Sequence, residues 1–311
     1  MIIGCNIDLY QSFQPSHKAR KNLFPLSQDF WRFSTQSEVD AFNLFNGTGE
    51  ATGFDASGYP TGLSTSGSDP TVSAFAVLLD GNEGTAVSGT YYIEWSGAGL
   101  NSVYVNEGGA KTLTFVGTDP ISGRNIASFP YNGGTLLVGM GSSVINDIRI
   151  YDDAFAGQDL DAEPWQSDWL ESWEQFAVIR FLDWIRTNNS ELETSAQLLL
   201  EGYFSQSGET ESLPIEWMVD LCNRTNTDFY LTVPVEAGDE LVQYYVDYIA
   251  ANLNPGLKLW LEYGNENWNA QFTQLTKIQT SALNDATIYP LTAGSGLTDD
   301  TTQAALIYAG S

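Results

Sequence analysis

The sequence has few of the residue types on which catalytic triads, disulfide scaffolds and metal centres depend. Its 311 residues include one histidine, His17, and two cysteines, Cys5 and Cys222. We therefore expect neither Ser-His-Asp chemistry nor a multi-histidine zinc site. Two cysteines form no disulfide framework, and we interpret both as small buried apolar residues. No Asp-x-Asp-x-Asn-Gly calcium loop occurs either, so we expect no metal and no cofactor.

Basic residues are also scarce, and this shortage narrows the possible partners. The 12 Lys and Arg residues stand against 39 Asp and Glu residues, which gives a net charge of −27 at pH 7. Such a surface repels the phosphates of nucleic acids and of anionic lipids, so neither nucleic acid nor membrane is an expected partner. No run of about 18 apolar residues is present to span a bilayer. Residues 1–6 also lack the basic start and long apolar core of a signal peptide, so classical export is not expected.

Aromatic residues, in contrast, are abundant. They make up 13% of the chain and include 9 Trp and 15 Tyr. Most aromatic side chains pack in protein cores. The chain is long enough for such cores, since 311 residues can form two ordinary domains or one large barrel. The alternative is that some of them stack on the apolar faces of sugar rings. An acidic, aromatic-rich chain with little lysine is compatible with a neutral-glycan site, and both interpretations stay open.

Residues 46–152 have the composition of an antiparallel β-sandwich. Gly, Ser and Thr are dense there, and Gly-rich turns separate short alternating runs. This spacing is typical of sandwich strands. The predicted strands are residues 72–79, 89–95, 111–116, 135–138 and 145–150. A short apolar run at residues 2–9 predicts one further, buried strand before this region.

The sequence after residue 151 alternates between helix and strand patterns. Trp165, Trp169 and Trp173 are four residues apart, which predicts one face of a helix packed on a sheet. The predicted strands that follow are residues 176–182, 228–234 and 257–263, and the predicted helices are residues 213–224 and 240–253. This alternation is typical of βαβ units and a parallel sheet, whose polar residues collect at the carboxyl ends of the strands.

The strongest local signal lies where the last predicted strand ends. The strand stops at Gly264 and is followed by Asn265 and Glu266. A carboxyl group there would lie at the mouth of a barrel, and the indoles of Trp260 and Trp268 could lower the local polarity, as a general acid requires. An equally open alternative is a helix N-terminus, capped by Asn265 and with Glu266 complementing the helix dipole.

The segment Tyr263-Gly264-Asn265-Glu266 resembles the Asn-Glu signature of the clan of retaining (β/α)8 glycoside hydrolases. The wider sequence resembles bacterial and phage barrel proteins with a β-sandwich inserted after the first strand, often described as cellulose-binding or glycosidase-like. The matching stretches are residues 3–8, 55–61, 89–92, 145–150, 179–184, 187–190 and 263–268. In that clan the Asn binds the sugar 2-hydroxyl and the Glu is the acid/base. The resemblance implies these roles for Asn265 and Glu266.

The fold implied by this resemblance is α/β plus all-β, an incomplete (β/α) TIM-type barrel with an inserted antiparallel β-sandwich. Residues 1–45 would form the first barrel strand and its connection. Residues 46–152 would form the carbohydrate-binding-like sandwich, and residues 153–311 would continue a barrel that is truncated relative to the family.

The resemblance also implies an arginine that steadies the nucleophile. Arg180 on the second strand would take this role, and the alternative is an ion pair with Asp183 or Glu262. Asp183 and Trp184 end the same strand and are expected to contact substrate. Trp268, beside Glu266, is a further expected contact.

Two loops after the predicted strands complete the expected site. Asn188 and Asn189 would line the cleft, or else cap their own loop. Glu236, after the third strand, is a weaker candidate for substrate contact.

The chain departs from the clan at the second carboxylate, which retaining hydrolysis needs about 5–5.5 Å from the first. The clan supplies it from the seventh strand. Only 45 residues follow Glu266, enough for a helix at residues 272–283 and a strand at residues 288–293. We therefore expect the barrel not to close, and Asp285, Asp299 and Asp300 match no position of the clan's nucleophile.

Three functions remain open from the sequence. The favoured one is a glycoside-hydrolase-like carbohydrate-recognition protein, a phage virion or other extracellular component that needs no classical signal peptide and binds a neutral polysaccharide or glycan. The alternative is a retaining glycosidase, or the N-terminal part of one, with Glu266 as acid/base. A third, with Asp8 or Glu262 as nucleophile, is disfavoured because Glu262 shares the strand of Glu266. An exposed sheet edge would also favour a homo-oligomer or virion partners.

Overall fold

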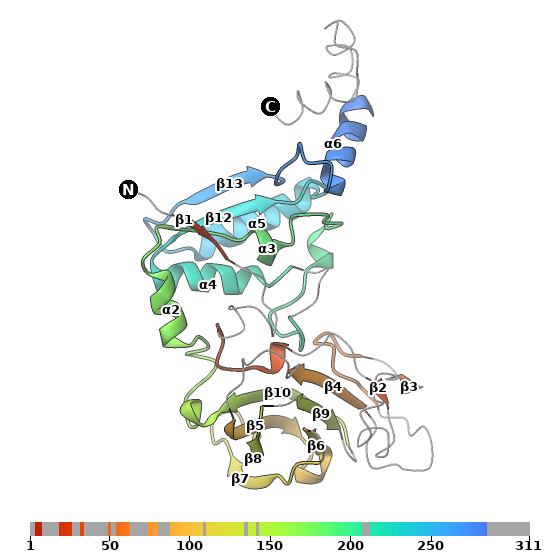
Figure 1. Ribbon diagram of the computed structural model, residues 1–311, viewed down its shortest axis with the longest axis vertical. Coiled ribbons are helices and arrows are strands. Elements are labelled where there is room, and N and C mark those ends of the chain that lie inside the picture. Colours follow the sequence, from red (N-terminus) through yellow and green to blue (C-terminus); the bar gives the residue numbers. More distant parts are fainter. Residues whose placement is uncertain are drawn as a thin grey trace, which may run out of the picture. The chain divides into compact units, whose positions relative to one another are not determined.

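The computed structural model describes the chain over residues 4–7, 19–26, 32–33, 49–50, 54–62, 74–79, 88–107, 110–133, 136–140, 143–206 and 212–284 (Figure 1). The chain divides into two compact units. The first unit comprises residues 1–8, 171–201 and 209–311, and the second comprises residues 9–170 and 202–208. This division groups residues 9–45 and 153–170 with the sandwich, whereas the sequence analysis assigned them to the barrel.

The first unit is built on a four-stranded parallel sheet. Its strands are β1 (Gly4–Asn6), β11 (Val178–Arg180), β12 (Asp228–Val233) and β13 (Leu259–Tyr263), in that spatial order. Cys5 pairs with Ile179, Ile179 with Phe229, and Phe229 with Leu259. The predicted parallel strands are therefore present. Four parallel strands in this order occur both in sectors of barrels and in open sheets, so the barrel itself stays a prediction.

Four helices follow the strands of this sheet, and the last three of them were predicted from the sequence. They are α3 (Leu182–Ile185), α4 (Ile215–Thr225), α5 (Asp239–Asn252) and α6 (Thr273–Asn284). Pro214 stands at the start of α4, and Asn226 ends that helix in the left-handed conformation, with φ 54°. Asp239 and Glu240 open α5, where their charge favours the helix N-terminus. The predicted helix at residues 272–283 is confirmed as α6, whereas the predicted strand at residues 288–293 lies outside the described residues.

Alternation along the strands divides the sheet into an apolar face and a polar one. Ile179, Phe229 and Leu231 are fully buried, and the ring of Phe181 lies 4.6 Å from that of Phe229. Helix α4 contributes Met218 and Leu221 to the same unit's core and contacts β12. Arg180, Tyr230 and Glu262 lie on the opposite face, because successive side chains of a strand point to opposite sides.

Both cysteines are free thiols. Cys222 is buried, as predicted, and burial raises the pKa of its thiol to about 12. The expectation for Cys5 was too strong, since this residue is only half-buried. None of the helices in the described part of the chain is long and apolar enough to cross a bilayer.

The second unit contains two antiparallel sheets. One has the order β10-β5-β8-β7 and the other the order β3-β2-β4-β9-β6. The strands are β2 (Arg32–Phe33), β3 (Gly49–Glu50), β4 (Ala74–Leu79), β5 (Gly89–Gly97), β6 (Val103–Asn106), β7 (Thr114–Thr118), β8 (Asn125–Tyr131), β9 (Leu136–Met140) and β10 (Ile145–Asp152). Each predicted strand of the sandwich region overlaps an observed one, and β3, β6 and β8 of this region were missed.

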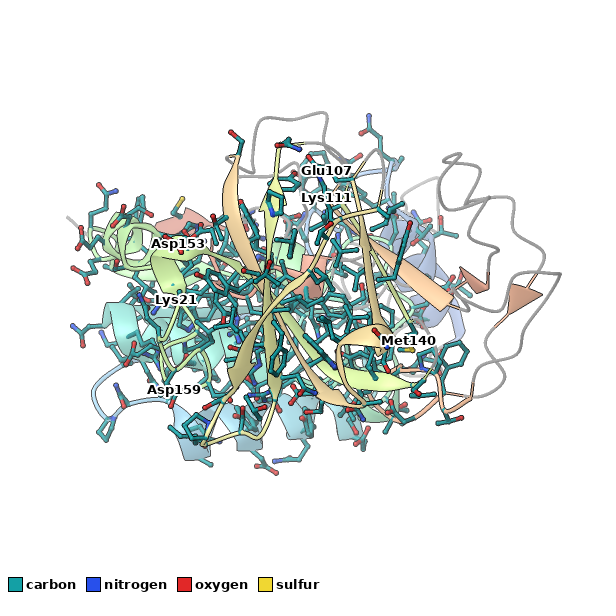
Figure 2. The ribbon with its side chains drawn as sticks, turned by 90° about the horizontal axis from the view of Figure 1, so that it is seen from below. Lys21, Glu107, Lys111, Met140, Asp153 and Asp159 are labelled. Atoms are coloured by element: carbon teal, nitrogen blue, oxygen red, sulfur yellow. The ribbon has the colours of Figure 1, made fainter. Side chains whose placement is uncertain are left out.

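Apolar residues of the longer strands form the core of this unit. Ile93 and Trp95 of β5 are fully buried, as are Val138 and Met140 of β9. Met140 is labelled in Figure 2. Lys111 pairs with Glu107 at 2.6 Å, and both side chains, labelled in the same figure, are largely buried. Buried aromatic and branched side chains on strands of alternating pattern are what a two-layer β-structure requires.

The stretch at residues 55–61 forms a packed corner of the second unit. Asp55 Oδ1 accepts hydrogen bonds from the backbone N–H groups of Ser57 and Tyr59, at 2.9 and 3.0 Å. The Tyr59 hydroxyl in turn accepts one from the N–H of Ile148 at 2.9 Å. Gly58 has φ +76°, and a Cβ there would lie 2.6 Å from the ring of Tyr203. The glycine is therefore required both by backbone conformation and by close packing.

One helix prediction was wrong in extent. Helix α2 (Ser167–Trp173) begins after Trp165, so the three indoles do not share one helical face. Within the second unit, the Trp165 ring is buried and stacks on Trp169 with 5.6 Å between ring centroids. The spacing of four was real, but Pro164 precedes the first of these residues and the helix starts later.

Candidate functional site

The carboxyl end of the parallel sheet gathers polar side chains around Arg180, the last residue of β11. Its Nε and Nη2 donate to Glu262 Oε2 at 3.1 and 2.5 Å. Nη2 also donates to Asn265 Oδ1 at 2.9 Å. The guanidinium carbon lies 5.5 Å from the centre of the Tyr230 ring. Of the two ion-pair partners considered for Arg180 from the sequence, the structure places Glu262 there.

This ion pair is partly buried from solvent. The side chains of Arg180 and Glu262 are 23% and 32% exposed. Burial, followed by the charge of Glu262, raises the pKa of Tyr230, so its phenol stays protonated at neutral pH. Two hydrogen bonds thus join Arg180 to Glu262 and a third holds Arg180 to Asn265, while part of each side chain of the pair still faces solvent.

Asn265 extends the cluster to the loop after α3. Its Nδ2 donates to Asn188 Oδ1 at 3.0 Å. Gln274 Nε2, from the first turn of α6, donates to Asn188 Oδ1 at 2.8 Å and to the Asn265 carbonyl at 2.7 Å. Gln274 is 2% exposed and was not expected from the sequence. We call Arg180, Glu262, Asn265, Asn188 and Gln274 the carboxyl-end network.

Asn189 ties the same loop to α6. Its Oδ1 accepts from the N–H of Thr273 at 2.9 Å, and its own N–H donates to Gln274 Oε1 at 3.1 Å. Asn189 therefore caps the N-terminus of α6 and not its own loop, because it satisfies an orphan N–H at the helix start. Asn188 instead joins the carboxyl-end network.

Asp183 and Trp184 follow β11 but belong to helix α3, not to the strand. Asp183 Oδ2 accepts from Asn6 Nδ2 at 2.8 Å, which links the first turn of α3 to the end of β1. Trp184 is 1% exposed, and its ring lies 5.7 Å from that of Phe181. The expected contact of Trp184 with substrate is therefore corrected: its indole is core and offers no surface to a sugar ring.

Glu266 lies in a tight turn after β13. It is exposed and has φ 45°, and its Oε2 accepts from Asn269 Nδ2 at 2.8 Å. Its carbonyl accepts from the Asn269 N–H, also at 2.8 Å. The carboxylate is thus available to solvent beside the network without contacting Arg180.

The two indoles expected near Glu266 differ in position. Trp268 follows Glu266 and is 74% exposed. Trp260 is 44% exposed, and its Nε1 donates to Asp228 Oδ2 at 3.0 Å. Asp228 begins β12, so Trp260 is held at the amino end of the sheet. The expectation that Trp260 lowers the polarity around Glu266 is corrected accordingly.

Glu236, after β12, pairs with Lys277 of α6 at 3.1 Å. Lys277 Nζ also donates to the Ser190 carbonyl at 2.9 Å. Glu236 therefore helps to hold α6 against the loops at the carboxyl end. Lys277 and Gln274 were both missed, since a polar helix face in a sequence does not reveal its partners.

Taken together, the carboxyl-end network presents paired donors and acceptors on side chains that hold one another in place. Guanidinium and amide N–H groups alternate with carboxylate and amide oxygens over a short distance. A hydroxyl group both donates and accepts, so it can bridge such neighbours. Among the described residues, no three His, Cys, Asp or Glu side chains are grouped so that they could hold a metal ion. Asp285, Asp299 and Asp300 lie outside the described residues.

Comparison with known proteins gives no relative for this chain: no family model, no curated protein and no solved structure matches it.

Proposed function

We propose that the first unit binds a neutral glycan at the carboxyl end of its parallel sheet, as a glycoside-hydrolase-like carbohydrate-recognition protein. The observation that carries this proposal is the carboxyl-end network, with the exposed indole of Trp268 following it in the chain. Carboxyl ends of parallel strands are where α/β proteins place their ligand sites. Sugars present hydroxyls at their rims and apolar C–H surfaces on their faces, which suits hydrogen-bonding groups beside an aromatic ring.

Binding is favoured over catalysis by the contacts of the two glutamates. Glu262 is engaged by Arg180, and Glu266 is exposed and hydrogen-bonded to Asn269. A retaining mechanism needs one carboxyl group kept protonated as acid and a second one as nucleophile. Glu266 is exposed to solvent, whereas such a mechanism works in a site closed to water.

The matched pair of exposed indoles provides a direct test. Trp268→Ala removes the exposed ring that follows Glu266 in the chain, and Trp260→Ala removes the ring held at the amino end of the sheet. Affinity for neutral polysaccharides (cellulose, xylan, mannan and starch) is measured by affinity electrophoresis, and for their oligosaccharides by titration calorimetry. Loss of one buried aromatic contact corresponds to at least about tenfold in affinity. Trp268→Ala should show this loss and Trp260→Ala should not, and equal effects of the two would contradict the site.

The second candidate is a retaining glycosidase that uses Glu266 as acid/base. It is favoured by one observation, the position of Glu266 directly after Asn265, which Arg180 holds. Aryl glycosides assayed with the wild type and with Glu266→Gln decide between the two. Equal background rates remove catalysis, whereas a rate that falls at least about a hundredfold in the variant establishes it.

We also propose that the sheet edge at β13 is covered by another chain, in a homo-oligomer or a virion. Among the described strands β13 pairs with β12 alone, and Leu261 and Tyr263 are 57% and 44% exposed. Open apolar strand edges are usually paired or protected. Light scattering of the wild type and of Leu261→Lys tests the homo-oligomer: a mass that falls in the variant supports it, and a monomeric wild type contradicts it.

A further inference from the structure

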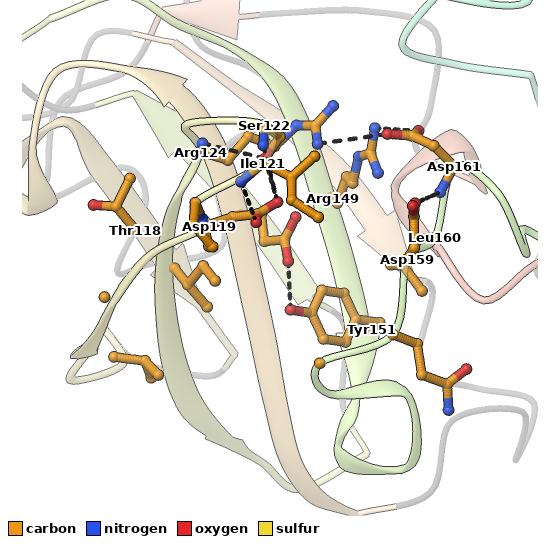
Figure 3. Close-up of a pocket in the computed structure, with 17 residues that line it drawn as sticks. Thr118, Asp119, Ile121, Ser122, Arg124, Arg149, Tyr151, Asp159, Leu160 and Asp161 are labelled. Carbon is orange, nitrogen blue, oxygen red and sulfur yellow. Dashed lines mark hydrogen bonds and ion pairs between the residues drawn. The ribbon is translucent and has the colours of Figure 1, made fainter.

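A pocket of about 520 Å³ lies in the second unit, on the outer face of the sheet β10-β5-β8-β7 (Figure 3). Its floor includes Glu94 of β5 together with Arg149 and Tyr151 of β10, and its walls are residues 116–122 and 157–161. The volume falls within the range of about 300–1,000 Å³ that is usual for small-molecule sites. No residue of the carboxyl-end network belongs to it.

The floor of this pocket carries charges that are buried although they stand on an outward-facing surface. Glu94, Arg124 and Arg149 are only 8%, 8% and 9% exposed. The Tyr151 hydroxyl donates to Glu94 Oε1 at 2.6 Å. Burial and the hydrogen bond to Glu94 raise the pKa of Tyr151, so this hydroxyl remains a neutral donor. Burying a charge is unfavourable unless it is paired, so a surface that only had to be soluble would leave these groups in water.

Carboxylates hold both guanidinium groups. Arg124 Nε donates to Asp147 Oδ2 at 2.5 Å. Arg149 Nη2 donates to Asp161 Oδ1 at 2.5 Å (Figure 3). Burial opposes the charge of Arg124, but the hydrogen bond and charge of Asp147 outweigh it and raise the pKa of the guanidinium. Each arginine has five N–H donors. These bonds therefore fix the orientation of both groups and leave further donors for a ligand.

Two irregularities in strand pairing shape the site. The register of β10 against β5 shifts between Asn146 and Arg149, and Asp147 in this bulge has φ 49°. The register of β7 against β8 shifts between Phe115 and Gly117. Bulges re-aim side chains and are enriched beside functional sites. The bulge in β10 turns the Asp147 carboxylate to Arg124, so the strained residue positions part of the floor.

The lining chemistry selects the class of ligand. The pocket residues with charge are the acids Glu94, Asp119, Asp159 and Asp161 and the bases Arg124 and Arg149. The excess of acid disfavours anions, and the guanidinium groups on the floor disfavour cations. An apolar ligand would displace water from the buried charges without replacing its hydrogen bonds. Hydroxyl groups can accept from the guanidinium groups and donate to Glu94 at the same time.

We propose that this pocket binds a small neutral saccharide or similar polyol. The exposed side chains of Val116 and Ile121, at 56% and 87%, supply apolar contacts at its rim. The site is separate from the one proposed in the first unit and does not depend on it.

The test uses the full chain with glucose, mannose, xylose, cellobiose and maltose, and with galacturonate and glucosamine as an anionic and a cationic sugar. Saturation-transfer NMR detects binding and titration calorimetry measures it. Glu94→Gln keeps the shape of the side chain and an acceptor for Tyr151 but removes the charge. Glu163→Gln makes the same change in the second unit outside the pocket lining and serves as the matched control. Ile121→Trp, at an exposed position, narrows the mouth without disturbing the core.

A neutral sugar should bind, and its affinity should fall at least about tenfold in Glu94→Gln, as expected when a hydrogen bond to a charged group is weakened. Ile121→Trp should also weaken binding, whereas Glu163→Gln should not. If Glu94→Gln does not fold, Ile121→Trp decides alone. Trp268→Ala must leave this binding unchanged, which separates the pocket from the first-unit site. Binding to none of the neutral sugars, stronger binding of galacturonate or glucosamine, or unchanged affinity in both pocket variants would overturn the proposal.

Discussion

Replacing Arg180 with methionine tests whether the carboxyl-end network is held together by this one side chain. Methionine keeps the length and apolar stem but removes three hydrogen bonds, two to Glu262 and one to Asn265. A fully exposed ion pair contributes about 0–1 kcal/mol, and breaking a fully buried one costs about 3–5 kcal/mol. With the side chains 23% and 32% exposed, the pair lies between these limits, at about 2 kcal/mol. The hydrogen bond to Asn265 adds about 1 kcal/mol.

We therefore expect Arg180→Met to lower the free energy of unfolding of the first unit by about 3 kcal/mol. Urea unfolding followed by tryptophan fluorescence measures this change. Part of the loss comes from leaving Glu262 without its partner, so Arg180→Met combined with Glu262→Gln should be less destabilised than the sum of the two single variants. A coupling energy of about 1–2 kcal/mol is expected from the double-mutant cycle. A single-variant loss below about 0.5 kcal/mol, or additive variants, would refute the reasoning.

Three further predictions concern packing and pH. Gly58→Ala should lower the free energy of unfolding by about 1–3 kcal/mol more than Gly157→Ala does. Both glycines have φ near +75°, but only a Cβ at Gly58 meets a neighbouring ring. Equal losses of stability in thermal unfolding would contradict this. Trp184→Ala should lower the free energy of unfolding of the first unit by about 3–5 kcal/mol, as for a core residue, and a loss near zero would show that Trp184 is not buried in the core. Alkali should unfold the second unit, since burial raises the pKa of its tyrosines above the ordinary value of 10, in one case (Tyr91) to about 12. In the unfolded chain these tyrosines ionise near pH 10, whereas in the folded unit they stay protonated at that pH. Above pH 10 the unfolded state therefore binds fewer protons than the folded state, and the free energy of unfolding falls as the pH rises. Tyrosinate absorbance should then rise together with loss of near-UV dichroism, and ionisation with intact dichroism would argue against it. The residues concerned are Tyr59, Tyr91, Tyr131 and Tyr151.

The parallel strands were predictable because each is a short apolar run bounded by polar residues. Residues 176–182 show where such a pattern fails, because their continuous apolar run predicts one strand. The strand ends at Arg180, and Leu182 already begins α3. Apolar runs do not by themselves distinguish a buried strand from a buried helical turn. Here Phe181, with φ −99° and ψ 30°, makes the change of direction.

Strand β8 was missed for a different reason. It contains Pro130, which has no N–H to donate and lowers the expectation of a strand. The structure accommodates it because Pro130 pairs with Thr90 of β5 on one side, while the pairing of β7 with β8 extends only to Ser128 on the other. The decisive fact is where the preceding strand β7 begins: it starts at Thr114, opposite Ser128, and the residues around Pro130 do not reveal this.

The candidate site was predictable in its location but not in its contacts. Arg180 and Asn265 were expected at the carboxyl ends of strands, and they are there. Their bond to each other joins residues 85 positions apart. Gln274 and Lys277 carried no signal, because polar residues in the first turns of a helix are ordinary. Contacts between loops and α6 depend on how α6 is docked, which local pattern does not encode.

The turn after β13 explains why Asn265 and Glu266, adjacent in the sequence, meet different surroundings. Gly264 has φ +67°, which strains any other residue, and a Cβ there would also have to displace the Asn267 side-chain amide. After this glycine the Asn265 side chain contacts Arg180, whereas Glu266 is exposed and its backbone is in the left-handed conformation. That conformation costs a non-glycine residue about 1–2 kcal/mol, and the two hydrogen bonds from Asn269 offset it. Strain of this kind persists where the surroundings hold it, so the turn is built to fix Asn265 within a network and Glu266 at its rim. An exposed glutamate at the rim of the network can accept a hydrogen bond from a bound sugar in this conformation, whereas acid catalysis would need further groups that exclude water around it.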